Sequence, residues 1–237
     1  MKKRTKISIA ILVAVIAVLG IATGIYAADY YHAVDIDEYI TSSNGVTVSQ
    51  IDEGYFFDGP SEDKALIFYP GAKVEETAYA PIMKSLAEQG VDCFLIKMPM
   101  KLAVLGANKA DKIREKYDYD NYYLAGHSLG GAVVANYAAK RTNNCDGLFL
   151  LAAYPTKDLT FTRFPIVLLY GDNDKVLNRE KLKTGFTLVP SDYKKVEITG
   201  GNHAHFGSYG VQDGDGTATI TPEEQWKITV DTILENL

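Results

Sequence analysis

Residues 122–131 read Tyr122-Tyr123-Leu124-Ala125-Gly126-His127-Ser128-Leu129-Gly130-Gly131. The apolar beginning of this stretch predicts a strand, and apolar side chains recur at helical spacing from Leu129 to residue 140. Between them lies Gly-x-Ser-x-Gly, whose glycines allow the tight packing that a sharp strand-to-helix turn needs. This pattern is typical of a nucleophile elbow, which projects the serine hydroxyl from the end of a parallel sheet. We therefore expect Ser128 to be a nucleophile.

A serine hydroxyl is unreactive at neutral pH, so this hypothesis requires an acid and a histidine base, which follow the serine along the chain in this architecture. An apolar run at residues 164–170 predicts a buried strand, and Gly171-Asp172-Asn173-Asp174 follows at its carboxyl end. Ligands of open α/β sheets bind at such ends. Asp172 and Asp174 are both candidates for the acid, because aspartates in such a cluster also serve as turn residues.

The base must come from a small set, since the chain has 4 histidines. His127 lies inside the elbow, and His32 lies next to the apolar N-terminal segment. His203 and His205 follow a strand predicted at residues 194–198. The glycines ahead of Asn202 suit a tight turn that aims the next side chain at the sheet edge, which favours His203 over His205.

A serine nucleophile also requires two backbone N–H groups that point at the developing negative charge. One comes from the residue after the nucleophile, which is Leu129, and the other from the loop after the third strand. A strand predicted at residues 64–69 runs into Pro70-Gly71-Ala72. Because Gly71 makes the turn, the Ala72 N–H is the candidate for the second donor.

The N-terminus predicts a membrane segment. Four basic residues lie within the first 6, and the 22 residues from 7 to 28 carry no charge. This run can cross a bilayer as a helix, and it exceeds the roughly 7 to 15 apolar residues of a cleavable signal. The basic flank stays inside, so we predict an anchored protein at the cell membrane, a single-pass protein with its catalytic domain extracytoplasmic. A secreted protein, cleaved near Ala27 or Ala28, is the alternative.

Residues 29–237 are predicted to form one domain. The chain has 24 basic and 30 acidic residues, and four of the basic ones precede residue 7, so the remainder carries 20 against 30, a formal charge of −10. This balance argues against nucleic acid as a partner. The aspartates near residue 213 do not match a calcium loop, because Ala218 stands where that loop requires glycine. We predict no metal and no cofactor, and no oligomeric state follows from the sequence.

Strands and helices alternate along this domain, which predicts a mostly parallel central sheet flanked by helices. The predicted strands are residues 46–49 and 54–57, which form a leading hairpin, and then 64–69, 92–98, 122–125, 147–152, 164–170 and 194–198. The predicted helices are residues 77–89, 102–116, 129–140 and 222–237, the last with a capping box at Thr221 and a proline at its first position.

The chain resembles small proteins of the α/β-hydrolase fold, in the compact group related to dienelactone hydrolases, over residues 64–237. The stretches that carry the resemblance are Tyr69-Pro70-Gly71-Ala72-Lys73-Val74, residues 78–87, 97–105 and 126–131, Leu150 to Pro155, Gly200-Gly201-Asn202-His203-Ala204 and residues 206–216. The resemblance implies an α/β-hydrolase fold, with Ser128 as nucleophile, Asp174 as acid and His203 as base. It also places Cys93 and Cys145 at the fourth and sixth strands with two strands between them, about 14 Å apart and beyond the reach of a disulfide. We expect free, buried thiols.

These inferences together predict a serine hydrolase that cleaves a carboxylic ester or related acyl small molecule through an acyl-enzyme. A peptidase, an amidase or an acyltransferase with the same triad is an alternative, as is a non-catalytic hydrolase-fold binding protein at the cell envelope, because a fold alone does not decide function. Residues 153–163 are too few for a helical cap, so we expect an open, shallow site. The aromatic candidates to line it are Tyr79, Tyr154, Phe206 and Tyr209.

Overall fold

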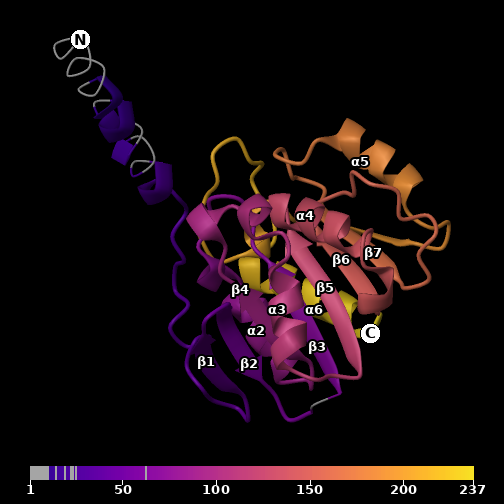
Figure 1. Ribbon diagram of the computed structural model, residues 1–237. Coiled ribbons are helices and arrows are strands. Elements are labelled where there is room, and N and C mark those ends of the chain that lie inside the picture. The colour runs from indigo at the N-terminus through magenta and orange to yellow at the C-terminus, as the bar shows by residue number, and fades with distance from the viewer. Residues whose placement is uncertain (1–10, 14, 19, 22–23, 25, 62) are drawn as a thin grey trace. The chain divides into compact units, whose positions relative to one another are not determined.

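The computed structural model describes residues 11–13, 15–18, 20, 21, 24, 26–61 and 63–237 (Figure 1). The chain divides into two compact units, Met1–Tyr30 and Tyr31–Leu237. The described residues between 11 and 28 are helical. Among the residues described, no helix is both long and apolar enough to span a membrane. The predicted transmembrane segment, residues 7–28, includes positions outside the described ranges.

The second unit is built on a sheet of eight strands in the order β1-β2-β4-β3-β5-β6-β7-β8. β1 pairs antiparallel with β2, β2 pairs antiparallel with β4, and all the other pairs are parallel. The strands are β1 (Thr47–Ile51), β2 (Gly54–Asp58), β3 (Lys64–Tyr69), β4 (Asp92–Ile96), β5 (Asn121–His127), β6 (Gly147–Leu151), β7 (Ile166–Gly171) and β8 (Lys194–Ile198). The predicted leading hairpin and the mostly parallel sheet are confirmed.

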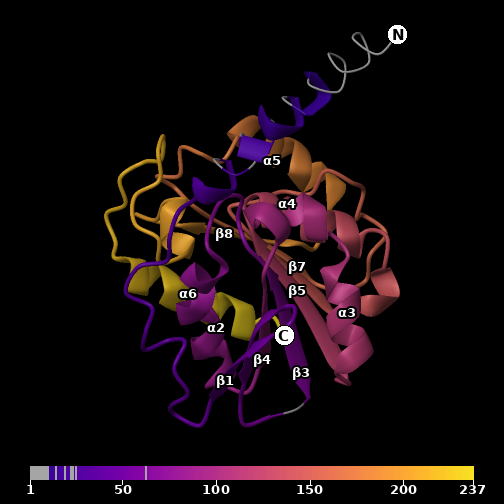
Figure 2. The same cartoon turned by 60° about the vertical axis from the view of Figure 1, so that its left-hand side comes forward.

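Helices cover both faces of this sheet, which is why the central strands read as nearly continuous apolar runs. Residues of α2 (Ala80–Ala87) and α6 (Pro222–Leu234) share one buried cluster with Phe68 and Phe149. Residues of α3 (Lys109–Lys116), α4 (Leu129–Ala138) and α5 (Arg179–Gly185) share a second buried cluster with alternate residues of the same strands. Figure 2 shows α2 and α6 on one side of the sheet and α3 and α4 on the other.

Short 3-10 turns complete the unit. They are η1 (Glu76–Tyr79), η2 (Pro99–Lys101), η3 (Ala103–Gly106), η4 (Thr142–Asn144), η5 (Phe186–Leu188) and η6 (Ala204–Phe206). Most of them lie in connections at the carboxyl ends of strands, where the chain turns toward the next helix. The segment between β6 and β7 contains no helix.

Two predicted helices are divided in the structure. Residues 77–89 form η1 followed by α2, and the proline at the second position of α2 is tolerated because the first turn needs no intrahelical N–H donor. Residues 102–116 form η3 and then α3. The single helix predicted there was wrong, because the Tyr69 hydroxyl accepts from Ala110 N at 2.9 Å and donates to Ala107 O at 3.0 Å. A buried side chain thus caps a new helix start that periodicity does not reveal.

The C-terminal helix and the cysteines match expectation. Thr221 accepts from Glu224 N, and the Glu224 carboxylate accepts from Thr221 N, so the capping box of α6 is confirmed. Cys93 lies in β4 and Cys145 just before β6, and both are free and buried. Burial raises the pKa of the Cys145 thiol to about 12 and that of Cys93 well above its ordinary value. The thiols are therefore protonated and poorly nucleophilic in the folded protein.

Candidate active site

Ser128 occupies the sharp turn between β5 and α4. Its backbone has φ 52° and ψ −121°, a conformation that non-glycine residues rarely adopt and that costs roughly 1 to 3 kcal/mol. The turn is held on both sides, since Ser128 N donates to Leu151 O at 2.9 Å and Ser128 O accepts from Ala132 N at 3.1 Å. The serine is half-buried, and the strained turn projects its side chain from the carboxyl edge of the sheet.

A glycine after Ser128 permits a close backbone approach that assembles the site. A Cβ on Gly130 would lie 2.1 Å from Tyr69 O and 2.3 Å from Pro70 O. The first turn of α4 therefore packs against the end of β3 with no room for a side chain. This packing brings residues 70–73 beside the serine turn.

Of the three N–H groups of residues 71–73, two form hydrogen bonds within the structure. Gly71 N donates to the Tyr79 hydroxyl at 3.1 Å, and Lys73 N donates to Lys101 O at 2.9 Å. For Ala72 N, no partner is found within the described part of the chain. Leu129 N lies in the first turn of α4, where N–H groups have no intrahelical acceptor. Ala72 and Leu129 are half-buried, and their N–H groups are the candidate donors to a developing oxyanion.

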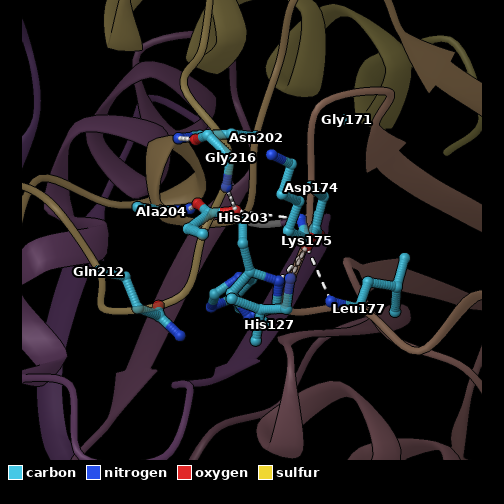
Figure 3. A network of polar contacts seen from close by, with 12 residues as sticks. His127, Gly171, Asp174, Lys175, Leu177, Asn202, His203, Ala204, Gln212 and Gly216 are labelled. Atoms are coloured by element: carbon cyan, nitrogen blue, oxygen red, sulfur yellow. Dashed lines mark hydrogen bonds and ion pairs between the residues drawn. The ribbon is translucent and has the colours of Figure 1, made fainter.

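His203 and Asp174 form a buried pair at the same edge (Figure 3). His203 Nδ1 lies 2.8 Å from Asp174 Oδ2, and the side chains are 2% and 0% exposed, respectively. The other carboxylate oxygen accepts from Val176 N at 2.9 Å and from Leu177 N at 2.8 Å. Because the carboxylate accepts the Nδ1 proton, His203 presents a free Nε2 that can accept a proton from another group.

The ring of His203 lies next to the elbow. Its centroid is 4.5 Å from that of His127, which immediately precedes Ser128 in the chain, and Figure 3 shows the two rings together. The three predicted residues thus come from the end of β5, the loop after β7 and the loop after β8, and they converge on one edge of the sheet.

The rejected candidates have other roles. Asp172 is exposed, and its carboxylate accepts from Gly200 N at 2.8 Å, so it stabilises the turn ahead of the histidine. His205 is half-buried and lines a cavity of about 530 Å³ with Trp226. Burial lowers the pKa of His205, against the opposing influence of Asp215.

A second buried network lies behind the serine. The Tyr79 hydroxyl accepts from Gly71 N and lies 2.8 Å from His127 Nδ1. The Tyr79 hydroxyl can bond both neighbours if it donates its hydrogen bond to His127 Nδ1. The ring proton of His127 is then on Nε2. Burial, reinforced by His203, holds the pKa of His127 well below its ordinary value, and burial raises the pKa of Tyr79. His127 is therefore a neutral structural partner of the loop that carries Ala72.

Sequence reasoning missed this network and one further support. Tyr79 and Phe206 were expected to line the site, but both are 0% exposed and belong to the buried core. Asp215 joins the acid and base loops, because its carboxylate accepts from Ala204 N at 2.9 Å and from Lys175 N at 3.3 Å. The roles of Tyr79 and Asp215 have no local sequence signal, since their partners lie in other segments of the chain. Within the described residues, no group of three or more His, Cys, Asp or Glu side chains is placed to hold a metal ion.

The profile of the alpha/beta hydrolase family matches residues 65–227. The chain belongs to this family. No curated protein sequence matches this chain.

Solved structures share the fold. A predicted CIB-like hydrolase from Thermoplasma acidophilum superposes with a TM-score of 0.63 at 16% identity, covering 81% of this chain and 100% of the other. Carboxylesterase CesB from Bacillus subtilis gives a TM-score of 0.60 at 10% identity, with 92% and 97% covered. Est1E from Butyrivibrio proteoclasticus gives 0.56 at 16% identity, with 81% and 98% covered. At these identities the likeness concerns the fold alone.

We expect Tyr79→Phe to lower the free energy of unfolding by about 1 to 3 kcal/mol, because Gly71 N–H and His127 Nδ1 would lose their shared buried partner. Chemical denaturation of the purified protein measures this change. The matched control is Tyr154→Phe, at a half-buried tyrosine, which should cost less than about 0.5 kcal/mol. Equal effects of the two substitutions would contradict the assigned network.

Proposed function

We propose that the protein is a serine hydrolase that cleaves a carboxylic ester or related acyl small molecule through an acyl-enzyme intermediate. The observation that carries the proposal is the buried Asp174–His203 pair beside the strained turn at Ser128. A buried carboxylate that orients a histidine is the arrangement a serine needs to become nucleophilic. Carboxylesterase CesB has the same fold, so this scaffold is compatible with ester chemistry.

The proposed reaction begins when Ser128 Oγ attacks the acyl carbon while His203 Nε2 takes the hydroxyl proton. The carbonyl oxygen becomes an oxyanion that accepts from the N–H groups of Leu129 and Ala72. His203 then gives its proton to the leaving alcohol as the C–O bond breaks, which leaves an acyl-enzyme. A water molecule repeats the sequence on the acyl-enzyme, releases the acid and returns the proton to Ser128.

The proposal also includes the cellular location. We place the protein at the cell membrane, held by residues 7–28 and oriented by the four basic residues ahead of them, with the domain outside the cytoplasm. The support is the uncharged length of this segment, which suffices for a bilayer-spanning helix.

Ser128→Ala should abolish covalent labelling by a fluorophosphonate probe and lower turnover of an activated ester by about 10⁴-fold or more, because the reaction loses its nucleophile. Labelling of the purified full chain followed by mass spectrometry measures the first effect, and the modified peptide should contain Ser128. Near-normal hydrolysis by this variant would refute the triad. An unreactive wild-type protein would favour the non-catalytic binding protein.

His203→Ala should be nearly as damaging as Ser128→Ala, since members of a triad act as one unit. His205→Ala is the matched control, two residues along the same loop, and should cost less than about tenfold in kcat/KM. The comparison uses initial rates on the same ester. If the two substitutions had reversed effects, His203 would not be the base.

The full-length protein should fractionate with membranes and resist carbonate extraction if residues 7–28 are an uncleaved anchor. Protease added to wall-stripped cells should reach the domain, because the basic flank keeps the N-terminus inside. N-terminal sequencing of any soluble form distinguishes the alternative, since a start near Ala28 or Asp29 means a cleaved signal. Protection of the domain from external protease would overturn the orientation.

A further inference from the structure

Residues 31–34, hereafter the strap, lie along two loops of the candidate site. Tyr31 N donates to Lys73 O at 2.7 Å, and Glu75 N donates to Tyr31 O at 2.9 Å, so the strap forms a parallel bridge with the loop that carries Ala72. A side chain adds to this contact, because Ala33 N donates to Glu75 Oε2 at 3.1 Å.

The far end of the strap binds the loop that follows His203. Val34 N donates to Ser208 O at 2.8 Å, and the Ser208 hydroxyl donates back to Val34 O at 2.6 Å. The Tyr31 hydroxyl reaches further along this loop and accepts from Asp213 N at 3.2 Å. The strap is therefore bonded at once to the loop with the second oxyanion donor and to the loop with the base.

The strap has the alternating exposure of an extended strand. Tyr31 and Ala33 are half-buried and pack against the core, whereas His32 and Val34 point outward, which is the alternation of an extended strand. The end of the strap also lines the cavity of about 530 Å³, where Val34 and Glu38 share the lining with His205 of the histidine loop.

The backbone next to the oxyanion donor gives this contact its significance. Lys73 follows Ala72 and has φ 56°, a left-handed conformation that a side-chain-bearing residue holds only when its neighbours constrain it. The constraints are the bond from Lys73 N to Lys101 O and the bond from Tyr31 N to Lys73 O. Loss of the second bond removes one of the contacts that hold Lys73 in this conformation, and it weakens the support of the backbone that leads to the Ala72 N–H.

We propose that the strap is a positioning element of the catalytic machinery, which holds the Ala72 N–H in register with His203 by bonding both of their loops. The inference rests on the proposed serine hydrolase activity. Ser208 N also donates to Ala78 O, so the two loops have a second link, and loss of the strap loosens the site without separating its parts. A displacement of about 1 Å in a catalytic group costs up to about 10²-fold in rate.

The test uses the full chain with Glu75→Ala and Ser208→Ala combined, which removes the side-chain bonds between the strap and each of the two loops. Glu75 accepts from Ala33 N and lies 3.5 Å from His32 Nδ1, and Ser208 donates to Val34 O. The matched control combines Glu88→Ala and Thr41→Ala. It likewise removes one carboxylate and one hydroxyl, but from contacts away from the strap, where Glu88 accepts from Asn44 and the Thr41 hydroxyl donates to Asp37 O.

The strap variant should lose about tenfold in kcat on an activated ester with little change in KM, and a trifluoromethyl ketone, which mimics the oxyanion, should bind about tenfold more weakly. Adding the hydroxyl back through Ser208→Thr in place of Ser208→Ala should restore part of kcat. The control variant should match wild type in both. Equal losses of kcat in the two variants would overturn the proposal, as would a strap variant in which KM rises and kcat is unchanged.

A readout independent of activity separates this inference from the proposed function. Tyr31 N–H is protected by its bond to Lys73 O, so its hydrogen exchange should accelerate in the strap variant and not in the control. A wild-type protein that hydrolyses no ester and is not labelled by a fluorophosphonate would refute the proposed hydrolase activity. Unchanged exchange at Tyr31 in the strap variant of an active enzyme would refute the role of the strap.

Discussion

The close approach of the first turn of α4 to the end of β3 is the constraint on which the rest of the site depends. Gly130 packs against Tyr69 O and Pro70 O at a distance that admits no side chain. This contact forces the sharp turn at Ser128, and the hydrogen bond from Ser128 N to Leu151 O holds its strained backbone. It also sets the loop of residues 70–73 beside the N-terminus of α4, so one packing event positions the serine and both candidate oxyanion donors.

The candidate acid and base depend on a different kind of support. A carboxylate as buried as that of Asp174 is costly unless its oxygens receive hydrogen bonds. Val176 N, Leu177 N and His203 Nδ1 supply three donors, and Asp215 ties the two loops together through Ala204 N. The serine side of the site is therefore positioned by close packing of backbone. The histidine side is positioned by hydrogen bonds to the buried carboxylate of Asp174 and the half-buried carboxylate of Asp215.

The strands and the serine turn were predictable because their signals are local. Apolar runs between turn residues mark the central strands, and the glycines around Ser128 mark the elbow. Asp174 was separable from Asp172 only by resemblance, since both occupy the same turn. Their roles differ by their distant partners, which are Gly200 N for Asp172 and the His203 ring for Asp174. The role of Tyr79 could not be predicted from the sequence, because it depends on hydrogen bonds to Gly71 and His127, which are 8 and 48 positions away. The break ahead of α3 was missed for the same reason, since Tyr69 that causes it lies in another element.

The strap shows how a segment with no motif can matter to chemistry. Nothing in Tyr31-His32-Ala33-Val34 suggests a site, and the bonds that give it a role are mostly to main-chain atoms of Lys73, Glu75 and Ser208. Its first bonded residue comes after Ala28, so both an anchored and a cleaved form of the chain retain all of it. Cleavage near Ala28 would therefore leave every bond of the strap in place, whereas an alteration that reaches residue 31 removes its bonds to Lys73 and Glu75. The bonds by which the strap supports the two loops begin at Tyr31, the first residue of the second unit.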